Sequence, residues 1–121
     1  VKDIMHQNEE MPILKDNAKI NDIILEMTSK RLGCVGFVND NGEFVGMFTD
    51  GDLRRCINQD LKHIVAKDIM TKNPITIQKD TFITEAVKIM NEKKITNIFV
   101  IENNKPIGTV HIHDLLKYGA A

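Results

Sequence analysis

Two short segments of the chain combine residue types that suit a ribose and its phosphate. The first carries Gly46, Thr49 and Asp52, each three residues after the last, where a β-rich run leads into an expected helix. Glycine allows a close approach, a hydroxyl beside free backbone N–H groups favours phosphate, and a carboxylate accepts hydrogen bonds from adjacent ribose hydroxyls. Thr49 and Asp52 also fit a capping box, which needs no ligand. The spacing alone leaves both interpretations open.

The second segment repeats this spacing in altered form. Gly108 and Asp114 correspond to the glycine and the carboxylate, but His111 takes the place of the hydroxyl. His111 and His113 alternate at the end of an expected strand, so we predict that their side chains share one face. Metal sites normally use three or four ligands, and Asp114 is the only obvious third group here. A neutral imidazole that donates to a ligand or to nearby backbone is therefore favoured, and we predict no metal site.

Several charged and polar residues near the two segments extend the candidate site. Arg54 and Arg55 lie one turn into the expected helix, where a guanidinium suits a carboxylate or phosphate, although a solvated helix face is the alternative. Lys72 and Asn73 add a cation and an amide on an extended segment. The candidate ligand-binding residues are Gly46, Thr49, Asp50, Asp52, Arg54, Arg55, Lys72, Asn73, Pro74, His111, His113 and Asp114. We predict no catalytic residue, because the chain has no nucleophile with a nearby base and no P-loop or Rossmann fingerprint.

Composition excludes several broad classes of protein. The chain has 121 residues, 42% of them hydrophobic, with no Trp and one Tyr, so we expect an aliphatic core. A net charge of −1 gives no general reason to bind nucleic acid or an anionic membrane. No apolar run approaches the roughly 20 residues of a membrane span. Cys34 and Cys56 lack zinc-finger spacing, and we expect both to be buried thiols in a reducing cytosol.

An internal repeat organises the whole chain. Lys-Asp-Ile-Met occurs at 2–5 and again at 67–70, and each copy is followed by a Pro-Ile pair. Each half then shows an amphipathic helical pattern, a strand–turn–strand unit and a short closing helix. The expected hairpin strands are 35–38 with 44–48 and 98–101 with 107–112; the expected closing helices are 52–58 and 114–118; the linker is 59–65. Asp16 or Asn17 should cap the first amphipathic helix. We therefore predict domains at 1–62 and 63–121.

These halves resemble tandem CBS domains, also called a Bateman module. The resemblance rests on the Asp-Ile-Met opening, the helix, the hairpin and the closing Gly-x-x-Thr-x-x-Asp. It implies an α/β (α+β) fold of two pseudo-symmetric units, each a short β-sheet with two helices, forming one module with two clefts for nucleotide-like ligands. In that family the Thr and Asp of the motif contact phosphate and ribose, which here implies Thr49 and Asp52. His111 departs from the pattern, so the second cleft is either empty or specialised for another ligand.

Longer strings resemble arabinose-5-phosphate isomerases. These strings span residues 28–33, 48–55 and 110–116. The family joins a sugar-isomerase (SIS) domain to a C-terminal CBS pair and interconverts ribulose 5-phosphate and arabinose 5-phosphate on the route to Kdo of lipopolysaccharide or capsule. The resemblance implies that this chain is a non-catalytic regulatory part. Its expected ligand is CMP-Kdo or an adenine or cytidine nucleotide, with no required cofactor.

The same resemblance implies partners and a location. The expected partners are the chain's own upstream SIS domain and further copies of the chain, as a dimer or, in the full-length protein, a tetramer. The expected location is the cytoplasm. Two alternatives remain: a ligand-free oligomerisation module, and an adenylate-sensing CBS pair attached to another enzyme or a transporter.

Overall fold

Two small sheets with their own helices make up the computed structural model, which describes residues 1–56 and 63–118. The chain divides into two compact units, each with its own hydrophobic core. Unit 2 comprises residues 12–74, whereas unit 1 combines residues 1–11 with the chain from residue 75 onward. This confirms the mixed α/β class.

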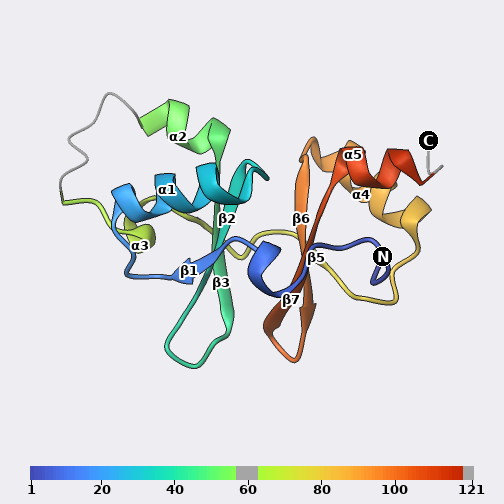
Figure 1. Ribbon diagram of the computed structural model, residues 1–121, viewed down its shortest axis with the longest axis horizontal. Helices are drawn as coiled ribbons and strands as arrows, with labels where there is room; N and C mark the ends of the chain where they lie inside the picture. The colour runs from blue at the N-terminus through green and yellow to red at the C-terminus, as the bar shows by residue number, and fades with distance from the viewer. Residues whose placement is uncertain (57–62, 119–121) are drawn as a thin grey trace. The chain divides into compact units, whose positions relative to one another are not determined.

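Unit 2 is built on a four-stranded sheet in the order β1-β2-β3-β4. Strand β1 (Ile13–Lys15) runs parallel to β2 (Cys34–Val38), which pairs antiparallel with β3 (Phe44–Thr49). Strand β4 (Thr71–Lys72) adds to the far side of β3. Helices α1 (Ile20–Lys30) and α2 (Asp50–Cys56) lie away from the β2–β3 turn, and the short α3 (Ala66–Ile69) precedes β4 (Figure 1).

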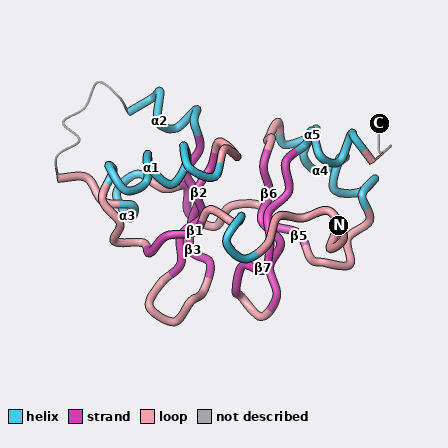
Figure 2. The backbone as a smooth tube through the Cα atoms, in the orientation of Figure 1, coloured by secondary structure: helices cyan, strands magenta, loops and turns pink. Residues whose placement is uncertain are grey.

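Unit 1 repeats this plan with one strand fewer. Strands β5 (Thr76–Ile77), β6 (Asn97–Glu102) and β7 (Lys105–His111) form its sheet, with β5–β6 parallel and β6–β7 antiparallel. Helices α4 (Ile83–Lys93) and α5 (Ile112–Lys117) accompany it, and the 3-10 helix η1 (Asn8–Glu10) lies in its N-terminal segment, residues 1–11. Figure 2 shows the two hairpins as neighbouring strands joined by loops. Both predicted hairpins are therefore confirmed.

The two copies of Lys-Asp-Ile-Met each pack beside the hairpin of the other repeat. Residues 67–70 lie in unit 2 with the first hairpin, and residues 2–5 lie in unit 1 with the second. Met70 packs over Gly46 of β3, and Met5 packs over Gly108 of β7. The compact units therefore differ from the sequence halves, because the segment that contains each Lys-Asp-Ile-Met copy belongs to the unit of the other half. The domain boundary at residue 62 stays a prediction.

Local details differ from expectation at the helix ends. The predicted cap by Asp16 or Asn17 is wrong: α1 begins at Ile20 behind Lys19, which makes no side-chain cap. The amide of Ile20 instead donates to the carbonyl of Ile64 at 3.3 Å, so this first N–H group of the helix needs no side-chain cap. The closing helices begin earlier than predicted, at Asp50 and Ile112. The predicted end at residue 58, and most of the predicted linker, lie outside the described residues.

The cores are aliphatic with a few phenylalanines, as composition predicted. Unit 2 buries Ile23, Val35, Phe37 and Phe48 at its centre, and unit 1 buries an equivalent set from α4, β6 and β7. The thiols expected to be buried, Cys34 and Cys56, are both buried.

Candidate functional site

The structure divides the predicted ligand-binding residues between the two units. Unit 2 contains Gly46, Thr49, Asp50, Asp52, Arg54, Arg55, Lys72, Asn73 and Pro74, and unit 1 contains His111, His113 and Asp114. Each group therefore has to be assessed as a site of its own unit.

Thr49 and Asp52 form a reciprocal capping box at the start of α2. The amide of Thr49 donates to Oδ2 of Asp52 at 3.0 Å, and the amide of Asp52 donates to Oγ1 of Thr49 at 3.3 Å. The Thr49 hydroxyl also lies 3.1 Å from the same Oδ2. Oδ1 of Asp52 accepts from the Arg55 guanidinium. The motif therefore caps α2, as the capping-box alternative predicted. The Asp52 side chain is only 18% exposed.

This arrangement still leaves chemistry for a ligand. A carboxylate offers about four lone-pair positions, and the contacts to Thr49 and Arg55 occupy three of them. The remaining position is on Oδ1, next to a guanidinium that is largely exposed. A ribose hydroxyl can donate a hydrogen bond to such a position. Arg54 is exposed on the same helix.

Lys72 lies next to Gly46, because their Cα atoms are partners in the β3–β4 pairing. Asn73 follows with a left-handed φ of 52°, a conformation that asparagine tolerates better than most residues, and turns the chain toward Pro74. The structure thus brings Lys72 to the strand that leads into the Thr49–Asp52 turn.

Gly46 has a packing role that the sequence did not reveal. A Cβ on this residue would lie 2.8 Å from Cγ of Met70 and closer still to its Sδ. The space beside the glycine is therefore filled by the chain's own methionine. Gly108 repeats this arrangement with Met5. The role of Gly46 in ligand binding stays a prediction.

His111 and His113 do lie together, but not as alternating residues of one strand. β7 ends at His111, and His113 is already in the first turn of α5. Their ring centroids are 4.7 Å apart. Nδ1 of His111 accepts from the amide of His113 at 3.1 Å, so the neutral ring carries its proton on Nε2 and can donate from there. Burial, followed by the charge of His113, lowers the pKa of His111 below its ordinary 6.5.

Sequence reasoning missed His6, which holds Asp114. Nε2 of His6 lies 2.9 Å from Oδ2 of Asp114, and Nδ1 lies 3.0 Å from Oε1 of Glu10. Burial lowers the pKa of His6, but the hydrogen bonds to Glu10 and Asp114 outweigh it, so the net pKa is raised above 6.5. The position of His6 directly after Asp-Ile-Met was visible in the sequence, but its partner is 108 residues away.

Asn97 is a second residue that the sequence analysis missed. It is 5% exposed and is the β6 partner of His111 in the β6–β7 register. Within the part of the chain that the structure describes, its Oδ1 is the only fully buried side-chain oxygen or nitrogen without a hydrogen-bond partner. The corresponding pair in unit 2 is Cys34 with Thr49. The second repeat has therefore replaced both members of this pair with more polar side chains.

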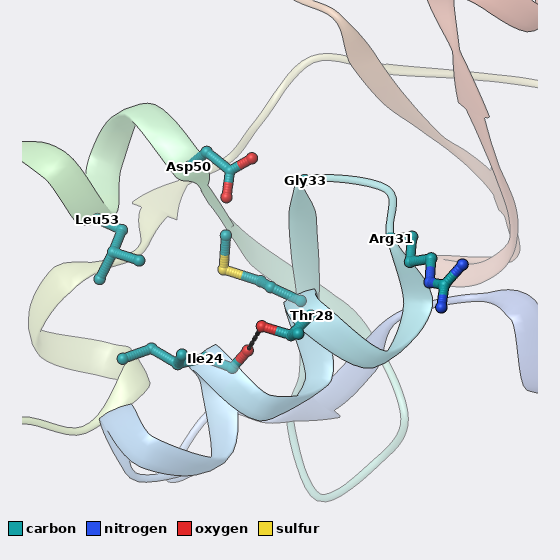
Figure 3. Close-up of a pocket in the computed structure, with 7 residues that line it drawn as sticks. Ile24, Thr28, Arg31, Gly33, Asp50 and Leu53 are labelled. Atoms are coloured by element: carbon teal, nitrogen blue, oxygen red, sulfur yellow. Dashed lines mark hydrogen bonds between the residues drawn. The ribbon is translucent and has the colours of Figure 1, made fainter.

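A cavity of about 250 Å³ opens in unit 2 between α1 and α2 (Figure 3). Its lining is Ile24, Met27, Thr28, Arg31, Gly33, Asp50 and Leu53. The Asp50 carboxylate lies over Gly33, so close that a Cβ there would be 2.9 Å from Oδ2. Of the predicted site residues, only Asp50 lines this cavity. Its other lining residues were not predicted, although the strings at 28–33 and 48–55 contain several of them.

Among residues 1–56 and 63–118, no group of three or more His, Cys, Asp or Glu side chains is arranged so that it could hold a metal ion. Within these ranges, no helix is long and apolar enough to cross a membrane.

Comparison with known proteins places this geometry in context. The CBS domain family matches residues 1–59 and 66–121. Arabinose 5-phosphate isomerase KdsD of Escherichia coli (strain K12) is 37% identical over 121 residues, which is 98% of this chain and 37% of the relative. The chain thus spans little more than a third of the length of this relative.

Solved structures share the fold. The CBS domain pair of protein MJ0100, solved with 5-methylthioadenosine and S-adenosyl-L-methionine, has a TM-score of 0.87 and 22% identity, covering 98% of this chain and 93% of that one. CBSX2 in complex with AMP has a TM-score of 0.86 and 21% identity, covering 97% and 92%. Both are CBS structures whose ligands contain an adenosine group.

Proposed function

Because the chain belongs to the CBS domain family, with two copies of the domain, we propose that it is the regulatory pair of an arabinose-5-phosphate isomerase. The similarity to KdsD over 98% of the chain is the observation that carries this proposal. In the whole protein an SIS domain would perform the isomerisation in the cytoplasm, on the route to Kdo. The pair itself would be non-catalytic and would sense a nucleotide or sugar nucleotide.

The unit 2 site supports a ribonucleotide as the ligand. Asp52 offers its remaining lone-pair position to a ribose hydroxyl, and the exposed guanidinium of Arg55 lies beside it. Arg54 and Lys72 add cations within the same unit. CMP-Kdo, which has a ribose, a phosphate and a carboxylate, is an economical candidate, and simpler adenine or cytidine nucleotides share the ribose and phosphate.

Calorimetry with CMP-Kdo, CMP and AMP tests this proposal. We expect binding of at least one of them, and Asp52→Ala should weaken it more than tenfold, about 1.4 kcal/mol. Asp114→Ala is the matched variant in the other repeat and reports whether the ligand uses unit 1. Absence of binding by all three at millimolar concentration would refute the proposal, and an unchanged affinity of Asp52→Ala would reduce Asp52 to a helix cap.

Self-association is a second function that a specific observation favours. The large apolar side chains that are exposed among the described residues are Leu25, Ile75, Phe82, Leu116 and Tyr118. Such side chains can contact a second copy of the chain, and most such oligomers have two-fold symmetry. Light scattering tests it: a dimer or tetramer supports the oligomeric role, and a strict monomer at high concentration excludes it. Regulation and self-association can coexist.

A further inference from the structure

The His6 ring in unit 1 lies between two carboxylates, one on each ring nitrogen. Asp114 of α5 is 2.9 Å from Nε2 and Glu10 of η1 is 3.0 Å from Nδ1. An ionised carboxylate can only accept hydrogen bonds, so both ring nitrogens must carry a proton. With both carboxylates ionised, only an imidazolium satisfies the two contacts together.

The same residue fastens the N-terminal segment, residues 1–11, to the sheet. The amide of His6 donates to the carbonyl of Thr109 at 2.8 Å, and the amide of Thr109 donates back at 3.0 Å. Next to it, Met5 packs over Gly108. Because residue 12 begins unit 2, this segment is also where the chain passes from one unit to the other.

Among its described residues, unit 2 has no equivalent of this contact. Thr71 follows Asp-Ile-Met there, and it pairs with Met47 of β3 as His6 pairs with Thr109 of β7. Asp52, the counterpart of Asp114, is held by its own turn and by Arg55. Among the described residues, the imidazolium contact is therefore a feature of unit 1 and not of unit 2.

We propose that His6 is a protonation-dependent latch that fastens the N-terminal segment to α5 and occupies Asp114. When the ring loses a proton, one nitrogen becomes an acceptor that faces a carboxylate oxygen, and one of the two contacts is lost. The titratable groups that face the ring are Glu10 from η1, Asp114 from α5 and His111 from the end of β7, with His113 next to His111.

The charge balance around the ring agrees with this proposal. The two carboxylates raise the pKa of His6 even though burial opposes them, which places the transition above 6.5. Asp114 is released to other partners above that transition when Nε2 is the nitrogen that loses its proton, whereas loss from Nδ1 releases Glu10. Any effect of this release on a ligand that binds Asp114 rests on the proposed function. The protonation-dependent contact between His6 and Asp114 does not rest on it.

NMR of the chain between pH 5.5 and 8.5 tests the latch without any ligand. We expect the His6 ring to titrate above 6.5, and the amide protection factors of His6 and Thr109, corrected for intrinsic exchange, to fall about two- to fivefold across that transition. His6→Gln should abolish this fall, whereas His63→Gln, at an exposed histidine of unit 2, should preserve it.

Either of two results would overturn the latch. The first is a His6 ring that titrates at or below 6.5; the second is an equal pH dependence of the Thr109 protection factor in wild type and His6→Gln. The wild-type titration is informative even if the variant fails to fold. Because no nucleotide is present, these results are independent of whether the pair senses one.

Discussion

Replacing Gly46 by alanine should destabilise unit 2, because the side chain of Met70 already fills the space that a Cβ would need. The new carbon would lie 2.8 Å from Cγ and 3.2 Å from Cβ of Met70, and closer to Sδ. Adding a methyl group to a filled site commonly costs 1–3 kcal/mol. Methionine is flexible, but a rotamer change does not move its Cβ, so we expect a loss of about 1–2 kcal/mol in urea unfolding followed by circular dichroism.

A double-mutant cycle with Met70→Ala isolates the contact. Truncating the methionine removes the collisions with Cγ and Sδ and leaves only the 3.2 Å approach to Cβ, so Gly46→Ala should cost less in that background and the coupling free energy should be about 1 kcal/mol. Gly51→Ala is the matched control. Its Cβ would meet nothing nearer than 3.6 Å, and it lies inside α2, so it should gain about 0.5–1 kcal/mol.

The alternative role of Gly46, close approach of a ligand, gives a different pattern. If it is correct, Gly46→Ala lowers nucleotide affinity and leaves the unfolding free energy unchanged. Additive effects of the Gly46 and Met70 substitutions would likewise refute the packing argument.

Three further predictions follow from local geometry and can be tested by urea unfolding. Gly33→Ala should cost about 1 kcal/mol or more, because Gly33 has a φ of 74° and a Cβ there would lie 2.9 Å from Oδ2 of Asp50; no loss would contradict this. The pKa of His111 is lowered in the folded chain, so the unfolded chain binds a proton there more readily. The contribution of this difference to the free energy of unfolding should be present above about pH 6.5 and be lost as the pH falls. His111→Gln should reduce this fall in stability at acid pH. Lys94→Gly should stabilise by up to about 1 kcal/mol, because this C-cap of α4 has a φ of 57°, and destabilisation would show that the lysine charge matters more than the strain.

Local sequence signals predicted most of the elements. Asn-Gly between two β-rich runs predicted the first hairpin, and Gly42 does adopt a positive φ of 78° in that turn. The helical spacing of apolar residues likewise predicted α1 and α4, whose buried faces include Ile23 and Met90. These features depend on residues close in sequence, which is why a single sequence was sufficient.

Contacts between distant segments could not be predicted in this way. The pairing of Met5 with Gly108 and of Met70 with Gly46 requires the two Asp-Ile-Met segments to pack beside hairpins of the other repeat. Nothing local in either segment distinguishes this arrangement from packing within one repeat. The start of α1 was predicted wrongly for the same reason, because the amide of its first residue donates to the carbonyl of Ile64, which is distant in sequence, and not to a nearby side chain.

The two repeats hold equivalent acidic residues by different means, and this difference has a physical consequence. Asp52 is held by Thr49 and Arg55, both within three residues, so these contacts lie within α2 and the turn that precedes it. Asp114 is held by His6, which belongs to the N-terminal segment. A change that loosens this segment, such as deprotonation of His6, therefore alters the surroundings of Asp114 and leaves those of Asp52 intact. One repeat thus provides a fixed carboxylate, and the other provides a carboxylate whose availability depends on the segment that joins the two units.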